Sequence, residues 1–173
     1  MKSVRFLSSP DCEEVLRINS QSFPGVARLD SSELERLVAI PNEHLAMEGP
    51  DGRLVGYILA FRSDAPYDGE EFLTFVETSV RPFIYIDQIA VDAAMRRMGL
   101  ASILDKAVEA HALSTSIADL CCEVNLNPPN PVSLAFHQDR GFNQTSVLEA
   151  EDGRTVALMA KRLKRTETEA RET

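Results

Sequence analysis

The sequence lacks any surplus of positive charge. Its 173 residues include 18 Lys and Arg against 27 Asp and Glu, which gives a net charge of −9. Nucleic acids and anionic membrane surfaces are bound by clustered Lys and Arg, so we expect neither as the main partner. An acidic chain suits a cationic substrate such as an amine, although the same charge also serves solubility alone.

Cysteines and long apolar runs are also scarce. Cys12, Cys121 and Cys122 are an odd number with one adjacent pair, a pattern that fits neither a disulfide framework nor zinc spacing, and we expect no metal. No apolar run approaches the length of a membrane span, and the first residues turn polar too early for a signal peptide. We therefore expect a cytoplasmic protein with one domain over residues 1–164 and a charged, disordered tail over residues 165–173.

The hydrophobic pattern predicts one α/β domain with a mixed, partly antiparallel sheet. Strands are expected at 3–7, 44–48, 54–61, 83–91, 118–124, 142–149 and 154–163, and helices at 9–22, 31–41, from 100 onward, and 132–140. Residues 63–80 are expected to be irregular, because they gather five acidic residues and no Lys or Arg. That segment is either an exposed acidic loop or an electrostatic attractant for a protonated amine.

The stretch 84–112 is the part of the chain most suited to binding an anion. An apolar strand is followed by a short loop, and then by a helix that begins at Leu100. The first N–H groups of a helix lack partners and can receive phosphate, and Arg96 and Arg97 add cationic donors beside Gly99. A solvated loop is the alternative. The loop matches neither a Walker sequence nor a dinucleotide fingerprint.

One carboxylate interrupts the strand that precedes this loop. Strict alternation places Phe83, Tyr85, Asp87, Ile89 and Val91 on one face of the strand, and the residues between them on the other. A carboxylate among bulky apolar residues is costly unless it is paired or used. Asp87 is therefore a candidate for acid–base or substrate-orienting work, and the alternative is a bond to the backbone or to an Arg such as Arg81.

Two motifs resemble the GNAT (GCN-related N-acetyltransferase) superfamily. The spacing Arg96-x-x-Gly99-x-Ala101 after a strand resembles that family's pyrophosphate loop, Gln/Arg-x-x-Gly-x-Gly/Ala. The later run from Glu123 to Phe142 resembles the region that follows this loop in the family. Its motif, Glu-Val-Asn, Pro-Pro-Asn-Pro, a Ser, Phe-His and Gly-Phe, is similar to that of a bacterial branch of predicted acetyltransferases. In that region family members carry an Asn that touches the coenzyme and a Tyr seven residues later. Asn130 matches the Asn, and position 137 is His.

This resemblance implies a mostly antiparallel sheet of about six to seven strands flanked by about four helices. It implies acetyl transfer from acetyl-CoA to the primary amine of a small molecule or peptide, and it allows a homodimer. It implies that backbone N–H groups of the central strand face the reacting carbonyl. The residues that it assigns to the coenzyme are Ile89, Ala90, Val91, Arg96, Arg97, Met98, Gly99, Leu100, Ala101, Asn130, Ser133 and Phe136.

Three residues are candidates for the proton transfers. Glu123 occupies a strand position where several family members, such as the ribosomal-protein alanine acetyltransferases, carry a base, and Asp87 ranks second for that role. His137 stands where the family's Tyr protonates the departing coenzyme thiolate, and an imidazole can act there as acid or as base. The alternatives are structural: Glu123 as a sheet-edge or cap partner, and His137 as a packed helix residue.

Two further interpretations stay open. A non-catalytic acyl-CoA-binding module would explain the missing Tyr, and a plain protein-interaction domain would require the Arg-Gly loop to be coincidental. The sequence does not choose among a peptide N-terminus, a lysine, a polyamine, an amino acid and a drug as the acceptor.

Overall fold

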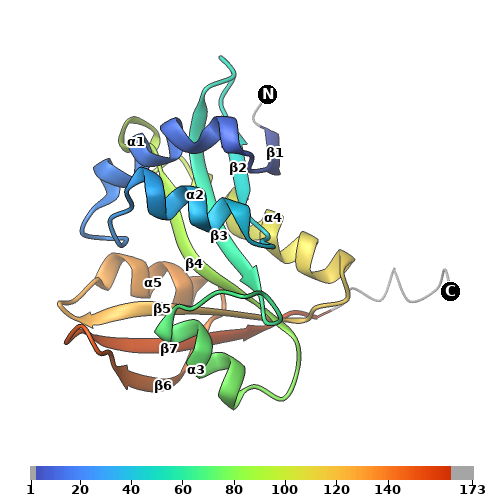
Figure 1. Cartoon of the computed structure of the whole chain (residues 1–173), viewed down its shortest axis with the longest axis vertical. Helices are drawn as coiled ribbons and strands as arrows, with labels where there is room; N and C mark the ends of the chain where they lie inside the picture. Colours follow the sequence, from blue (N-terminus) through green and yellow to red (C-terminus); the bar gives the residue numbers. More distant parts are fainter. Residues whose placement is uncertain (1–2, 165–173) are drawn as a thin grey trace, which may run out of the picture.

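A seven-stranded sheet runs through the computed structural model, which describes residues 3–164 (Figure 1). The strand order is β1-β2-β3-β4-β5-β7-β6. The strands are β1 (Ser3–Phe6), β2 (Leu45–Glu48), β3 (Leu54–Arg62), β4 (Phe83–Val91), β5 (Asp119–Asn127), β6 (Asn143–Glu149) and β7 (Thr155–Arg162). The helices are α1 (Cys12–Ser22), α2 (Ser31–Ala39), α3 (Glu70–Thr78), α4 (Leu100–Ser114) and α5 (Pro131–Asp139), with 3-10 turns at η1 (Ser9–Asp11) and η2 (Ala93–Met95). The predicted tail, 165–173, lies outside the described residues.

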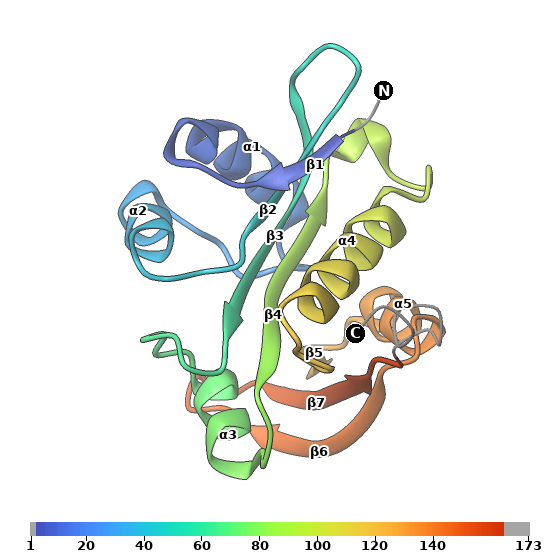
Figure 2. The same ribbon diagram turned by 90° about the vertical axis from the view of Figure 1, so that its right-hand side faces the viewer.

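Neighbouring strands pair antiparallel throughout the sheet except at β4 and β5, which run parallel. The predicted mixed, mostly antiparallel sheet is therefore confirmed, with five α-helices in the described part of the chain in place of about four. Helices α1, α2 and α3 cover one face of the sheet, and α4 and α5 cover the other (Figures 1 and 2). Each layer buries its own apolar cluster against the sheet.

The prediction that residues 63–80 are irregular is wrong, because Glu70–Thr78 form helix α3. Phe72 and Phe75 are spaced for one helix face and are both buried against β4, next to Phe83 and Tyr85. Burying one such ring contributes roughly 1.5–3 kcal/mol. The acidic residues Glu70 and Glu71 stand in the first turn, where the helix dipole favours them.

The predicted face pattern of β4 is wrong from Gln88 onward, because the strand carries a β-bulge. Leu59 of β3 pairs with Gln88, and the next residue, Ala60, pairs with Ile86, so Asp87 is the extra residue. Asp87 and Gln88 therefore lie on one face, and every later residue changes sides. Ile89 and Val91 pack with Ile84 and Ile86 in the cluster under α4, while Gln88 and Ala90 lie on the face of Tyr85.

Helix α4 is attached to the sheet by a stripe at four-residue spacing. Leu100, Leu104, Val108 and Ala112 are all buried in one cluster with β3, β4 and β5. This packing fixes the position of the helix N-terminus relative to the end of β4. Of the helices in residues 3–164, none is long and apolar enough to cross a bilayer.

Candidate functional site

The sheet opens between its two parallel strands. Strands β4 and β5 pair from Phe83 and Asp119 as far as Ile86 and Cys122, and then separate although both strands continue. The bulge at Asp87 begins one residue beyond the last pair. Beyond it, the edge of β4 that faces β5 has no strand partner in the described chain. A cavity of about 640 Å³ lies at this opening.

The N-terminus of α4 stands at one end of the cavity. Gly99 caps the helix in a left-handed conformation, with φ of 76°, and Ala101 lines the cavity wall. A Cβ on Gly99 would meet open space, so the glycine is needed for its backbone angle and not for close packing. Arg97 also adopts a positive φ, of 62°, and its side chain is exposed. The first N–H groups of α4 lack intrahelical partners and can receive an anion here.

Arg96 holds this loop against the end of α1. Its guanidinium donates to the Gln21 carbonyl at 2.9 Å and to Ser22 Oγ at 3.1 Å, and its Nε donates to the Val91 carbonyl at 3.3 Å. The backbone N–H of Ala93 donates to the Gln21 side chain at 3.1 Å. Arg96 therefore uses its Nε and Nη2 donors within the protein, where they hold the anion-binding loop in place.

Asn130 joins the two walls of the cavity. Its Oδ1 accepts from the backbone N–H of Ser133 at 3.1 Å, which caps α5, with Pro131 at the first helical position. Its Nδ2 donates to the Gly25 carbonyl at 3.1 Å, and Gly25 belongs to the α1–α2 loop. The α1–α2 loop, residues 23–30, is thereby tied to α5 across the opening.

A buried amide network holds the same loop from below. Asn19 donates to the Ala27 carbonyl at 2.9 Å and to Gln88 Oε1 at 3.0 Å, and it accepts from the Leu29 N–H at 3.0 Å. Gln88 donates to the Ala27 carbonyl at 3.0 Å, and the Tyr57 hydroxyl donates to Gln88 at 2.9 Å. Because the bulge turns Gln88 onto this face, it couples the shape of β4 to the position of the loop.

Two carboxylates meet at the other end of the cavity. Asp87 and Glu123 each follow the last paired residue of its strand, so they are cross-strand neighbours on one face of the sheet. Tyr67 donates to Asp87 Oδ1 at 2.7 Å, and Tyr85 donates to Glu123 Oε2. Burial raises the pKa of Asp87 to about 6. The pKa of Glu123 is raised well above its ordinary value, mainly by burial and then by the negative charge of Asp87.

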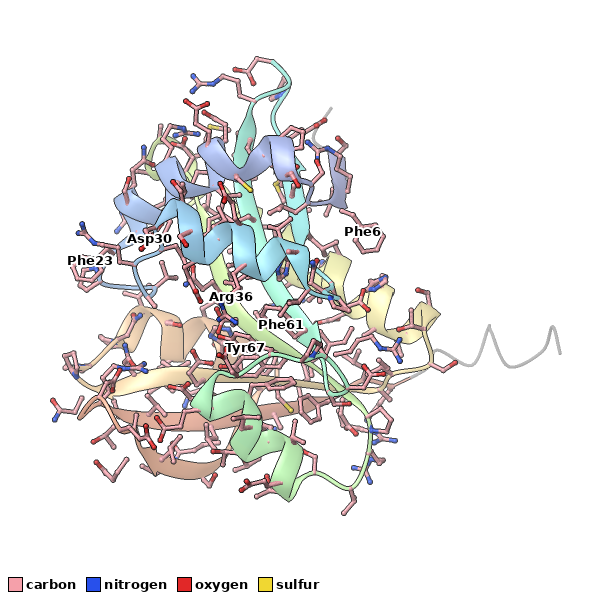
Figure 3. All side chains as sticks on the ribbon, viewed as in Figure 1. Phe6, Phe23, Asp30, Arg36, Phe61 and Tyr67 are labelled. Carbon is pink, nitrogen blue, oxygen red and sulfur yellow. The ribbon has the colours of Figure 1, made fainter. Side chains whose placement is uncertain are left out.

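Segment 63–78, which consists of the loop after β3 and helix α3, contributes to this end. Tyr67 stacks on Phe61, with ring centroids 4.1 Å apart, and lies beside α2 and Arg36 in Figure 3. Glu71 forms an ion pair with Arg154 of the β6–β7 turn at 2.9 Å. The alternative partner for Asp87 is excluded, because Arg81 pairs with Asp119 instead.

His137 lies in the cavity wall with one nitrogen already engaged. Its Nδ1 is 2.9 Å from the Ser133 carbonyl oxygen, which can only accept, so the proton of the neutral ring is on Nδ1. Burial between Phe136 and Phe142 lowers the pKa of His137. The ring is therefore neutral near pH 7, and Nε2 offers the cavity a lone pair in place of a proton.

The structure brings all three candidate catalytic residues to one cavity. Among the predicted coenzyme residues, those that line it are Ile89, Ala90, Val91, Arg96, Ala101, Asn130, Ser133 and Phe136. Arg97, Met98 and Gly99 are exposed on the adjoining loop, and Leu100 is buried in the core. Sequence reasoning missed Tyr85, Arg154 and the loop 23–30. Within residues 3–164 no group of His, Cys, Asp or Glu side chains is arranged to hold a metal ion.

Structural comparison finds solved structures with the same fold. The ribosomal-protein-S18-alanine N-acetyltransferase of Escherichia coli superimposes with a TM-score of 0.72 at 15% identity, covering 96% of each chain. Ard1 from Thermoplasma volcanium gives 0.73 at 20% identity, covering 95% of this chain and 99% of the other. NAA60 of Arabidopsis thaliana, solved with acetyl-CoA, gives 0.71 at 17% identity, covering 94% of this chain and all of the other. At these identities the likeness establishes the fold alone.

Sequence comparison supplies the family. The model of the acetyltransferase (GNAT) family matches residues 12–142, which is well over half of the 173 residues. The chain therefore belongs to the GNAT acetyltransferase family. A search of curated protein sequences finds no match to this chain.

Proposed function

We propose that the protein transfers the acetyl group of acetyl-CoA to a primary amine of a small molecule or peptide. The observation that carries this proposal is the opening between β4 and β5. It joins the N-terminus of α4 at one end to the carboxylate pair Asp87 and Glu123 at the other. An anion-binding helix end and a proton acceptor are the two things that such a reaction needs at opposite ends of one cavity.

The N-terminus of α4 suits the phosphate end of the coenzyme. The free N–H groups at the start of α4, with Arg97 beside them, would hold the diphosphate. The unpaired edge of β4 over Ile89–Val91 offers backbone groups to the pantetheine arm and to the thioester oxygen, where negative charge develops. Acetyl-CoA supplies the activated acyl group, and the protein supplies orientation and proton transfer.

Glu123 is the proposed base. An alkyl amine arrives as an ammonium ion and must lose a proton before it can attack. The raised pKa of Glu123 makes its carboxylate a better proton acceptor than an ordinary Glu. The ammonium ion first gives one proton to Glu123. The neutral amine then attacks, the new C–N bond forms as the C–S bond breaks, and the second nitrogen proton passes through water to the departing sulfur, so that the coenzyme leaves as a thiol.

His137 is proposed to accept a hydrogen bond in the cavity. The Ser133 contact fixes its proton on Nδ1, so the neutral ring cannot donate from Nε2. A lone pair at this place suits a pantetheine N–H group better than it suits protonation of the thiolate. Of the two roles that the sequence suggests, acid and base, only proton acceptance agrees with this geometry.

Release of coenzyme A thiol in the presence of amines is expected to test the activity itself. Purified protein with acetyl-CoA should release thiol faster when a primary amine is added, and mass spectrometry should find the N-acetylated amine. Binding of acetyl-CoA without thiol release across small amines and peptides would favour the non-catalytic module. A thermal shift that acetyl-CoA leaves unchanged would contradict both interpretations.

The two loop arginines are expected to behave differently. Arg97→Ala should weaken acetyl-CoA binding by about tenfold with an unchanged melting temperature, because it removes an exposed charge-assisted donor. Arg96→Ala should weaken binding and also lower the melting temperature, because it removes the links to Gln21 and Ser22. Calorimetry and thermal melts measure the two quantities, and Arg53→Ala, on a distant exposed turn, is the control. Unchanged affinity in both variants would place the coenzyme elsewhere.

A further inference from the structure

The acceptor end of the cavity carries more negative charge than one proton transfer requires. Glu123 alone suffices as a base, yet Asp87 lies directly beside it. Side-by-side carboxylates on neighbouring strands repel each other. In the described part of the chain neither one forms an ion pair. Asp87 receives the Tyr67 hydroxyl, and Glu123 receives the Tyr85 hydroxyl and its own backbone N–H. This pair is therefore short of positive charge.

Asp87 is also open toward the cavity. Tyr67 occupies its Oδ1, whereas Oδ2 has no donor among residues 3–164 and is not sealed off by protein atoms. Glu71 and Glu33 stand further out along the same cavity wall and add to the negative potential at Asp87. The negative field thus extends outward from the reacting position.

The cations at this end are already engaged. Arg154 is bound to Glu71 and also to Asp152, and Arg36 is bound to Glu33 and also to Asp68. Each guanidinium therefore serves two carboxylates. Arg28, which also lines the cavity, lies over the Phe23 ring on the α1–α2 loop, with 4.7 Å between its Cζ and the ring centroid.

We infer that the acceptor is a small aliphatic amine that carries a second positive charge, as a diamine does. This inference rests on the proposed function. When the reacting ammonium gives its proton to Glu123, it becomes neutral, and Asp87 is left as a buried anion without a counterion. A second ammonium on the same molecule supplies that counterion, and a monoamine cannot.

Segment 63–78 also limits the size of the acceptor. It contributes Tyr67 and Glu71 to the wall, and it is fastened on two sides. Asp68 pairs with Arg36 of α2 at 2.9 Å, and Glu70 accepts from the Glu151 N–H of the β6–β7 turn at 3.0 Å. Because this wall is held to α2 and to the β6–β7 turn, we expect the cavity to accept an unbranched aliphatic amine better than the N-terminus of a folded protein.

Three acceptors of the same carbon count test the inference directly. Cadaverine ends in an ammonium, pentylamine in a methyl group and δ-aminovalerate in a carboxylate. We expect kcat/KM for cadaverine to exceed that for pentylamine by about tenfold or more, with δ-aminovalerate the poorest, because the distal charge meets a weakly screened anion. An alanine-terminated peptide should be poorer than cadaverine. Equal values for cadaverine and pentylamine, or a better peptide, would overturn the inference and leave the acetyl transfer intact.

A charge-removing variant tests the cause. Glu33→Gln should reduce the ratio of the cadaverine to the pentylamine kcat/KM by about threefold, because it weakens the negative field without touching the base. Glu35→Gln on the same helix, exposed and outside the cavity, should leave the ratio unchanged. If neither variant changes the ratio of the cadaverine to the pentylamine kcat/KM, the negative potential does not select the acceptor. Thermal melts of both variants confirm folding. If none of the acceptors is acetylated while acetyl-CoA binds, the proposed function fails and this inference fails with it.

Discussion

Replacing Glu123 by Gln is expected to lower kcat for amine acetylation by about two to three orders of magnitude, the range that a positioned base contributes. The amide keeps the shape of the side chain and can still meet the Tyr85 hydroxyl, but it cannot take a proton. Acetyl-CoA affinity should stay within about twofold, because Glu123 lies away from the anion-binding end of the cavity. Steady-state kinetics and calorimetry measure the two effects separately.

The pH profile gives a second measure of the same residue. A base works only in its deprotonated form, so kcat/KM should rise with pH as the Asp87–Glu123 pair loses its proton. Because burial raises both pKa values, to about 6 for Asp87 and upward for Glu123, this rise should lie well above pH 4.5. Glu77→Gln, on the exposed side of α3, serves as the matched control. Near wild-type turnover in Glu123→Gln would move the base elsewhere, with Asp87 next in line.

Replacing Asn19 by Leu is expected to destabilise the fold by about 3 kcal/mol or more. The change leaves the partly buried Leu29 N–H without a partner, at roughly 1–3 kcal/mol. It also removes one of the two donors of the Ala27 carbonyl and one of the two donors of Gln88 Oε1, at roughly 0.5–1.5 kcal/mol for each bond lost. For a chain of this size the melting temperature should fall by about 6–12 °C.

The same substitution should also weaken acetyl-CoA binding, because Asn19 holds the α1–α2 loop that forms one wall of the cavity. Asn143→Leu is the control. Its amide, on the exposed strand β6, donates only to the neighbouring Gly141 carbonyl at 3.3 Å, and surface changes of this kind stay within about 0.5 kcal/mol. An unchanged melting temperature for Asn19→Leu would show that the network contributes little.

Local signals predicted most of the framework. The helices expected to begin at 9, 31, 100 and 132 begin within one residue of those positions, because helix starts depend on residues near in sequence. Helix α5, for example, is capped by Asn130 before Pro131 and is followed by a left-handed Gly141. The prediction for residues 63–80 rested on their acidic residues and not on the spacing of their apolar residues, so it did not include helix α3. Phe72 and Phe75, three residues apart, carried the signal that could have found it.

The interior of the site depended on contacts that no local pattern encodes. The bulge of β4 had one sequence signal, the consecutive polar residues Asp87 and Gln88 in an apolar strand, but alternation alone could not register it. Tyr67 and Asp87 are brought together by helix α3 folding back on the sheet. Two of the three partners of Arg96, Gln21 and Ser22, lie more than seventy residues away along the chain, on α1, so its structural role could not be read from the loop.

The bulge has a consequence for how this protein can change. The gap between the two parallel strands begins at one surplus residue, so we expect it to depend on the count of residues in β4 more than on their chemistry. Substitutions along the strand can alter what the gap admits and still leave it open. Deleting one residue of β4 at this place should let β4 and β5 continue to pair. It would also move the side chains of residues 88 to 91 to the opposite face of the sheet.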